Sequence, residues 1–243
     1  MKVSTQPVLY GVGIGPGDPE LMTLKAVRVL KGVDVIAVPK SKEEATSLAL
    51  DIIRDVIDLK DKEIVELIFP MKRNQMELVE AWEESKRQVI ERLEGDRDVA
   101  FITIGDPLFH STFIYLLEAL CRESPEDRFY NIEVIPGVSS INAASALSCT
   151  PLTKSGERMA VIPAMYGDKK LKETIEEFDT VVLLKANKAI DGIITVLEES
   201  GLKENAVFVS RAGLAGERVT RDLDSLKGKE LDYFSIIIIK KGL

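Results

Sequence analysis

The chain has 243 residues, of which 45% are hydrophobic and 30% are charged, and this is the composition of a globular protein. It is long enough for one large domain or two small ones. The formal net charge of −8 argues against a broad nucleic-acid-binding or anionic-membrane surface, so binding of an anionic substrate requires basic residues that cluster locally. The two cysteines, Cys121 and Cys149, are too few for a disulfide framework or a cysteine metal site.

The sequence also bears on the compartment. The start of the chain, MKVSTQPVLY, lacks the apolar core of a signal peptide. No apolar run approaches the ~20 residues that a membrane-spanning helix needs. We therefore expect a cytoplasmic protein with no membrane partner.

A glycine-rich turn, GVGIGPGDPE at 11–20, follows the first predicted strand at 8–10. Glycine permits positive φ and a close approach to a ligand, so Gly13, Gly15 and the neighbouring Pro16 are candidate ligand contacts. A strand, a glycine turn and a helix in this order are typical of the ligand-binding edge of a parallel α/β sheet.

The spacing of these glycines excludes the two familiar phosphate-binding motifs. In a G-x-G-x-x-G fingerprint the third glycine would fall at Pro16 or Asp18, and no lysine or hydroxyl residue follows Gly17 as a P-loop requires. The turn instead predicts a site for an uncharged or cationic ligand. The alternative interpretation is a tight β-to-α turn whose glycines have no role in binding.

The remainder of the first half alternates between strand and helix patterns, which predicts a parallel α/β sheet. The first helix is expected at 21–31, with Leu21, Leu24, Val27 and Leu30 on its buried face. A second strand at 33–38 is expected to end before Pro39. A helix at 45–56 is expected to follow a capping box formed by Ser41 and Glu44. The other expected elements are strands at 64–69, 98–104 and 132–135 and helices at 75–93 and 113–121.

Two further strand ends carry unusual loops. The strand at 98–104 ends in GDPLFHST, at 105–112, and the strand at 132–135 ends in PGVSS, at 136–140. Loops at the carboxyl ends of parallel strands line one crevice. We therefore expect both loops to face the first glycine turn.

The second half of the chain predicts a second, mixed α/β domain. Residues 151–153, PLT, resemble a linker, and we place the domains at 1–142 and 143–243. The elements expected beyond the linker are strands at 160–162, 180–184, 206–210, 217–221 and 234–239 and helices at 170–177 and 189–199.

Four motifs, GVGIGPGDPE, IGDPLFHST, VIPGVSS and PLT, occur in the order and spacing that resemble the tetrapyrrole methyltransferases of cobalamin and sirohaem synthesis. The similarity is greatest to the precorrin-2/cobalt-factor II C20-methyltransferases. This resemblance implies the class III methyltransferase fold and a homodimer. It also implies a cleft between the two α/β domains that binds S-adenosylmethionine, which leaves as S-adenosylhomocysteine.

Other functions remain open at this point. The chain could methylate another precorrin position or uroporphyrinogen III, or it could be a diphthine synthase. A nucleotide-dependent oxidoreductase is disfavoured by the missing dinucleotide spacing, and no feature supports a small-molecule sensor. The absence of a cysteine or histidine cluster predicts no protein metal site, so any cobalt arrives inside the substrate.

The resemblance also assigns the cofactor-binding positions beyond the first turn. The motif departs from the frequent Gly-Gly-Asp-Pro in having Ile104 before Gly105, so only the backbone of Ile104 can replace the first glycine. In this assignment the cofactor-binding residues are Gly13, Gly15, Pro16, Ile104, Gly105, Asp106, Phe109, Ser139, Ser140, Leu184 and Ala212.

Methyl transfer from a sulfonium is an in-line displacement that needs alignment more than acid–base help. Asp106 is the acid expected to hold the cofactor, at its amino group; the alternative is a carboxylate that stabilises the turn. His110, the single histidine, is a candidate base for the proton that the substrate carbon loses, although a lone histidine can be purely structural.

A tetrapyrrole of this type carries many carboxylates, and arginine suits forked carboxylate recognition. The candidates are Arg158, Arg211 and Arg218, with Lys72 and Arg73 after the third strand. Each is also compatible with an ordinary solvated surface charge.

Overall fold

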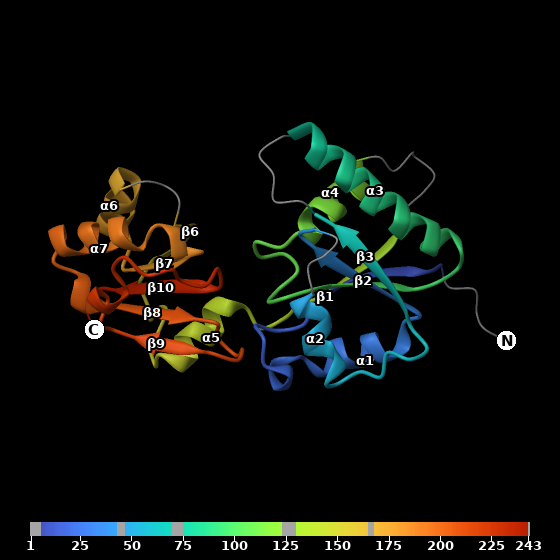
Figure 1. The fold of residues 1–243 in the computed structure, drawn as a ribbon, viewed down its shortest axis with the longest axis horizontal. Coiled ribbons are helices and arrows are strands. Elements are labelled where there is room, and N and C mark those ends of the chain that lie inside the picture. The colour runs from blue at the N-terminus through green and yellow to red at the C-terminus, as the bar shows by residue number, and fades with distance from the viewer. Residues whose placement is uncertain (1–5, 43–46, 70–74, 123–129, 165–167, 243) are drawn as a thin grey trace. The chain divides into compact units, whose positions relative to one another are not determined.

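A computed structural model of the protein describes residues 6–42, 47–69, 75–122, 130–164 and 168–242. The chain divides into two compact units, Met1–Ser139 and Ser140–Leu243, and each unit contains one five-stranded sheet (Figure 1). The two units are described separately below.

The first unit is a parallel α/β sheet, as the sequence predicts. Its strands lie in the order β3-β2-β4-β1-β5, and every neighbouring pair is parallel. Helices α3 and α4 lie on one face of the sheet and helices α1 and α2 on the other (Figure 1). The elements are β1 (Val8–Gly13), α1 (Leu24–Gly32), β2 (Val35–Lys40), α2 (Leu48–Arg54), β3 (Glu63–Ile68), α3 (Gln75–Glu94), β4 (Val99–Thr103), α4 (Phe113–Arg122) and β5 (Asn131–Ile135).

Strand β4 is at the centre of this sheet, and all its residues are buried because helices cover both faces. On the α3–α4 face the ring of Phe101 packs against Phe69 and Phe113, with ring centroids 5.9 and 5.5 Å apart. A Cβ atom built on Gly11 would overlap the ring of Phe113. The first glycine of the turn motif is therefore required by core packing rather than by a ligand.

The predicted buried face of the first helix is only partly right, because Leu30 is buried as expected but Leu21 and Leu24 are exposed. Helix α1 begins at Leu24, after a short 3₁₀ helix η1 (Pro19–Leu21), because the Thr23 hydroxyl accepts a hydrogen bond from Ala26 N at 3.1 Å. Leu24 is 90% exposed, and the buried side chains of the helix are Ala26 and Leu30. The cap sets where the helix begins, and the leucine pattern alone does not show which side faces the sheet.

The predicted end of the second strand is also wrong, since β2 continues through Pro39 to Lys40. Proline lacks the N–H that a central strand needs for its ladder. Here the pairing of β2 with β4 ends at Ala37, opposite Phe101, whereas its pairing with β3 continues to Lys40. Pro39 thus lies where one side of the strand no longer requires a donor.

The second unit is a mixed α/β sheet, which confirms the predicted class. Its strands lie in the order β6-β7-β10-β8-β9; β6 is parallel to β7, and the other pairs are antiparallel. The elements are α5 (Ser140–Leu147), β6 (Met159–Pro163), α6 (Asp168–Glu177), β7 (Thr180–Leu184), η2 (Ala186–Lys188), α7 (Ile190–Glu199), η3 (Lys203–Asn205), β8 (Ala206–Ser210), β9 (Arg218–Thr220), η4 (Asp224–Leu226) and β10 (Ser235–Lys240).

Helix α5 belongs to the second unit. Its buried residues Ile141 and Ala144 pack against the strands of the second sheet. The boundary that we placed after residue 142 therefore falls inside a helix. The interpretation of 151–153 as a linker is wrong, because Leu152 packs against the same core and its carbonyl accepts a hydrogen bond from the Thr180 hydroxyl at 2.6 Å.

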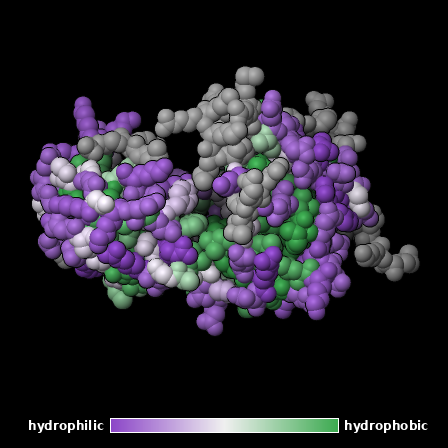
Figure 2. Space-filling view, in the orientation of Figure 1, coloured by the Kyte–Doolittle hydropathy of each residue, from purple (hydrophilic) through white to green (hydrophobic). Residues whose placement is uncertain are grey.

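The surface drawn in Figure 2 is mainly hydrophilic over the second unit, whereas hydrophobic side chains gather over part of the first. Among the described residues, none of the helices combines the length and the apolar character that a membrane crossing requires.

Candidate functional site

Three strand-end loops meet at the carboxyl edge of the first sheet. Because β1, β4 and β5 are adjacent and parallel, the loops that follow them emerge side by side. The first two loops are joined directly, since Gly105 N donates to Gly15 O at 2.7 Å in an isolated antiparallel bridge. Gly15 and Gly105 have φ values of +80° and +79°, which glycine adopts at little cost.

The third loop packs against the other two through glycine backbone. A Cβ atom on Gly13 would lie 2.6 Å from Gly105 O and 2.7 Å from Gly137 N. A Cβ atom on Gly137 would lie closer still to Gly105 O. Gly137 has no predicted role of its own in the sequence, although its position in the PGVSS turn is the available signal.

Gly105 differs from Gly13 and Gly137 in what surrounds it. Apart from the adjacent residues of the chain, a Cβ atom built there would meet one heavy atom of the described residues within 4 Å, Ser139 Cα at 4.0 Å. Gly105 is nevertheless a buried residue. The backbone of the second loop at Gly105 therefore borders an open space next to the third loop. A side chain at position 105 would occupy this space, and its absence leaves room for a ligand that binds against bare backbone.

Asp106 ties the second loop to the third. Its Oδ1 accepts a hydrogen bond from Leu108 N at 2.9 Å, and its Oδ2 accepts one from Gly137 N at 3.1 Å. The turn-stabilising interpretation of Asp106 is thus observed. Each carboxylate oxygen can accept more than one hydrogen bond, so this role leaves acceptor capacity for a ligand.

A pair of buried hydroxyls closes the base of the second loop. Ser111 Oγ donates to Thr103 Oγ1 at 3.0 Å and accepts from Phe113 N at 3.1 Å. The loop from 104 to 110 is therefore fixed at both ends, by the end of β4 and by the start of α4. Neither hydroxyl was recognised from the sequence, because a serine and a threonine eight positions apart give no pairing signal.

Phe109 and His110 lie at the exposed part of this loop. Phe109 is 37% exposed, and its ring lies edge-on to His110 with centroids 4.9 Å apart. His110 has a φ of +54°, which is unusual for a residue with a Cβ atom. The imidazole is exposed, so exchange of its proton with solvent is open.

The other predicted cofactor residues are divided between the units. In the first unit Pro16 is buried and Ile104 and Ser139 are half-buried, at the same edge as the glycines. Ser140 begins α5 in the second unit. Leu184 and Ala212 also belong to the second unit, at the end of β7 and after β8, and they pack in the same core cluster.

The structure separates the predicted substrate arginines. Arg158 directly precedes β6 and lies beside the start of β7, where Thr180 N donates to its carbonyl, whereas Arg211 follows the end of β8. Arg218 is opposite Ser210 in the register of β8 and β9, so it lies at the same edge as Arg211. Lys72 and Arg73 lie outside the described residues.

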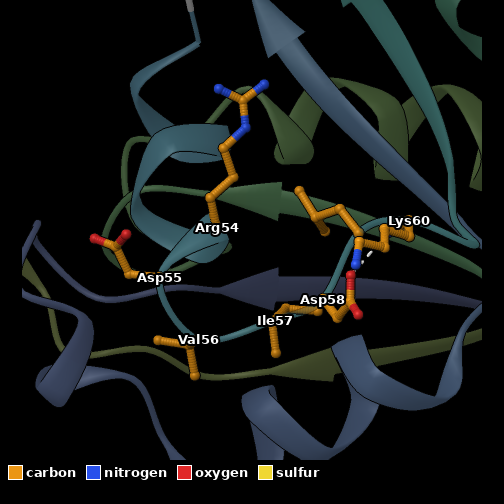
Figure 3. Close-up of a pocket in the computed structure, with 7 residues that line it drawn as sticks. Arg54, Asp55, Val56, Ile57, Asp58 and Lys60 are labelled. Carbon is orange, nitrogen blue, oxygen red and sulfur yellow. Dashed lines mark hydrogen bonds between the residues drawn. The ribbon is translucent and has the colours of Figure 1, made fainter.

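A surface hollow of about 670 Å³ lies elsewhere, along the loop from Arg54 to Lys60 that leads into β3 (Figure 3). This loop precedes β3 and is therefore at the amino edge of the sheet, opposite the three glycine loops. Its side chains point in different directions instead of converging, as Figure 3 shows. We do not assign a ligand to it.

Comparison with known proteins identifies the family. The model for Tetrapyrrole (Corrin/Porphyrin) Methylases matches residues 8–226. The chain belongs to the tetrapyrrole methylase family.

Two curated members of this family span nearly the whole chain. A probable cobalt-precorrin-2 C(20)-methyltransferase of Methanocaldococcus jannaschii is 37% identical over 238 residues, which cover 96% of each protein. The cobalt-precorrin-2 C(20)-methyltransferase of Salmonella typhimurium is 32% identical over 235 residues, again 96% of each.

Solved tetrapyrrole methylase structures share the fold. A cobalt precorrin-4 methyltransferase matches with a TM-score of 0.71 at 21% identity, over 96% of this chain and 94% of that one. The uroporphyrin-III C-methyltransferase of Thermus thermophilus, complexed with S-adenosylhomocysteine, matches with a TM-score of 0.66 at 26% identity over 97% of both chains.

The double role of Asp106 is testable with a matched acid. Asp18 makes the same local bond, from Glu20 N to its Oδ1 at 2.9 Å, but no bond to another loop is recorded for it in the described structure. We expect Asp106→Ala to lower the free energy of unfolding by about 2 kcal/mol, since Gly137 N loses a charged acceptor. It should also weaken S-adenosylhomocysteine binding, measured by calorimetry, by at least about tenfold.

The control variant Asp18→Ala should bind S-adenosylhomocysteine within about twofold of the unaltered protein, because only a local turn bond is lost. Equal dissociation constants for Asp106→Ala and the unaltered protein would remove Asp106 from the binding site.

Proposed function

We propose that the protein is an S-adenosylmethionine-dependent C-methyltransferase of cobalamin biosynthesis that methylates C20 of precorrin-2 or of its cobalt form. The observation that carries this proposal is the glycine edge of the first unit, where three loops present bare backbone without any phosphate-binding motif. The names of the two relatives at 37% and 32% identity support the position on the macrocycle.

The residues at this edge suit the cofactor. Bound S-adenosylmethionine would supply an electrophilic methyl group on a positively charged sulfur. The backbone of Gly105, beside its open space, would contact the cofactor, and Asp106 would accept hydrogen bonds from its amino group with its remaining lone pairs. Ile104 would contribute through its backbone, and Phe109 would cover an apolar part of the ligand.

Alignment is the main task that the chain has to perform. The hydroxyl pair of Thr103 and Ser111 and the bond from Gly137 N to Asp106 fix the second loop before any ligand arrives. A preformed loop avoids the entropy of ordering it at the moment of reaction, which favours an in-line displacement.

Basic residues of the second unit would bind the peripheral carboxylates of the macrocycle. Arg218 is exposed at the edge where β8 ends, and its Nη2 donates to Ser225 Oγ at 3.2 Å, so most of its donors face solvent. Arg158 lies at the other end of the sheet, and its Nη1 forms an ion pair with Glu177 Oε1 at 3.5 Å. Arg158 is therefore the weaker candidate for binding a substrate carboxylate. Leu184 and Ala212 remain our proposed cofactor contacts from this unit.

The proposal is tested by titration and assay. Calorimetry should detect binding of S-adenosylhomocysteine and not of NAD. Under exclusion of oxygen, the protein should transfer one methyl group to precorrin-2 or cobalt-factor II and none to uroporphyrinogen III. Methylation of uroporphyrinogen III instead would assign the protein to another branch of the family, and binding of NAD alone would contradict the proposal.

We further propose that the protein acts in the cytoplasm as a homodimer. Sedimentation at micromolar concentration should give about twice the monomer mass of 26.9 kDa. A monomer under these conditions would refute the dimer without affecting the proposed chemistry.

His110 is expected to help the reaction without being essential. The electron-rich macrocycle supplies the nucleophile, and the weakly acidic proton can leave to water after the methyl group has arrived. A general base that acts in the limiting step contributes ~10²–10⁴-fold. We expect His110→Ala to lower the single-turnover rate by less than about tenfold, or ~1.4 kcal/mol of barrier.

The dissociation constant of S-adenosylhomocysteine should not change in His110→Ala, since Asp106 and the loop backbone remain. A thousandfold slower reaction with intact binding of both ligands would show that proton abstraction by His110 limits the rate.

A further inference from the structure

Two cationic residues have left-handed backbone at one edge of the second sheet. Lys185 follows the end of β7 and has a φ of +58°, and Arg211 follows the end of β8 and has a φ of +53°. Strand β10 begins between them, because its residues Ser235 and Ile236 pair with the ends of β8 and β7. Both positions lie next to the proposed cofactor contacts of this unit, Leu184 and Ala212.

The left-handed backbone of Arg211 is explained by the loop that it supports. Its Nε donates to Ala215 O at 2.6 Å, and its Nη1 donates to Asp232 Oδ2 at 2.8 Å. Burial alone would raise the pKa of Asp232, but hydrogen bonds from Phe234 N and from Arg211 lower it on balance, so the acid stays ionised. The positive charge of Arg211 is therefore neutralised within the protein.

Lys185 has no comparable structural role. Its side chain is exposed, and within the described part of the chain no carboxylate forms an ion pair with its Nζ. The recorded contact of Nζ is the ring of Tyr233, whose centroid is 5.3 Å away. A cation in this arrangement is oriented by the ring and still has donors for an anion.

Tyr233 is part of an exposed aromatic pair. Its ring is 42% exposed and lies edge-on to Phe234, which is 37% exposed, with centroids 5.5 Å apart. An ammonium group oriented over the ring of Tyr233, with the partly exposed ring of Phe234 beside that ring, matches a ligand that combines an anionic group with a flat apolar body. The left-handed conformation of Lys185, with a φ of +58°, costs energy for a residue with a Cβ atom, and such positions cluster at functional sites.

We propose that Lys185, with Tyr233 beneath it, binds a peripheral carboxylate of the tetrapyrrole, so that the ammonium meets an acetate or propionate group and the rings contact the adjacent pyrrole. This inference rests on the proposed function, of which it specifies the substrate contact. Lys185 thus takes the place of Arg211, one of the three arginines expected to bind carboxylates, because the guanidinium of Arg211 is already paired with Asp232. The net charge of −8 makes such a local cation necessary for an anionic substrate.

The test compares Lys185→Ala and Lys185→Arg with Lys188→Ala, which removes an exposed charge three positions along the chain, in η2. In steady-state methylation assays, Lys185→Ala should raise KM for the tetrapyrrole by about tenfold or more, the effect of one hydrogen bond to a charged group. Its kcat and its dissociation constant for S-adenosylhomocysteine should stay within about threefold. Lys185→Arg should retain most of the affinity, and Lys188→Ala all of it.

Lys185→Gly separates binding from folding. It should unfold at a higher temperature than the unaltered protein, because glycine adopts the left-handed conformation freely, and its KM for the tetrapyrrole should rise as in Lys185→Ala. An unchanged KM in Lys185→Ala or in Lys185→Gly would overturn the assignment. If the unaltered protein methylates no tetrapyrrole, the proposed function itself is refuted. That outcome is distinct from an unchanged KM in the variants, which refutes only the role of Lys185.

Discussion

The backbones of Gly13, Gly105 and Gly137 lie against one another with no room for a Cβ atom on the first or the third. This close approach is possible because three neighbouring parallel strands release their loops at one edge of the sheet. It also fixes what these three loops can offer a ligand: backbone N–H and C=O groups at short range, since the loops themselves contain no lysine or arginine. The proposed preference of the site for an uncharged or cationic ligand follows from this arrangement.

Polar side chains stabilise the arrangement from outside the glycine contact. Asp106 accepts hydrogen bonds from its own loop and from Gly137 N, and Ser111 joins the end of β4 to the start of α4. Each of these groups bridges two segments, so their effects on stability and on ligand affinity are coupled. The second unit differs, because its sheet edge carries charged and aromatic side chains around Lys185 and Arg211.

The sequence predicted the sheets better than it predicted the roles of single residues. Continuous apolar runs such as 99–103 are typical of buried parallel strands, and turn residues mark their ends, so element type and order could be predicted. The buried face of α1 could be predicted only in part, because the helix capped by Thr23 begins at Leu24, three residues after the start that we expected, and Leu24 points to solvent.

The site shows the same limit. The glycine spacing located the three loops, but it did not show that Gly11 makes room for Phe113, whereas Gly137 makes room for Gly105. From their charge alone, Arg158 and Arg211 were equally good candidates for binding the substrate carboxylates. Only the folded chain shows that the two lie at opposite ends of their sheet and that Asp232 neutralises Arg211. The backbone conformation of Lys185 has no signal in the sequence at all.

The convergence of the loops on glycine backbone is tested most directly by calorimetric titration of Gly137→Ala with S-adenosylhomocysteine. Gly32→Ala is the control, because a Cβ atom there meets nothing within 4 Å and the residue has no positive φ. We predict that Gly137→Ala keeps its helical content but binds S-adenosylhomocysteine at least about tenfold more weakly, since the third loop must move away from Gly105. Gly32→Ala should bind it normally. An unchanged dissociation constant in Gly137→Ala would contradict the account.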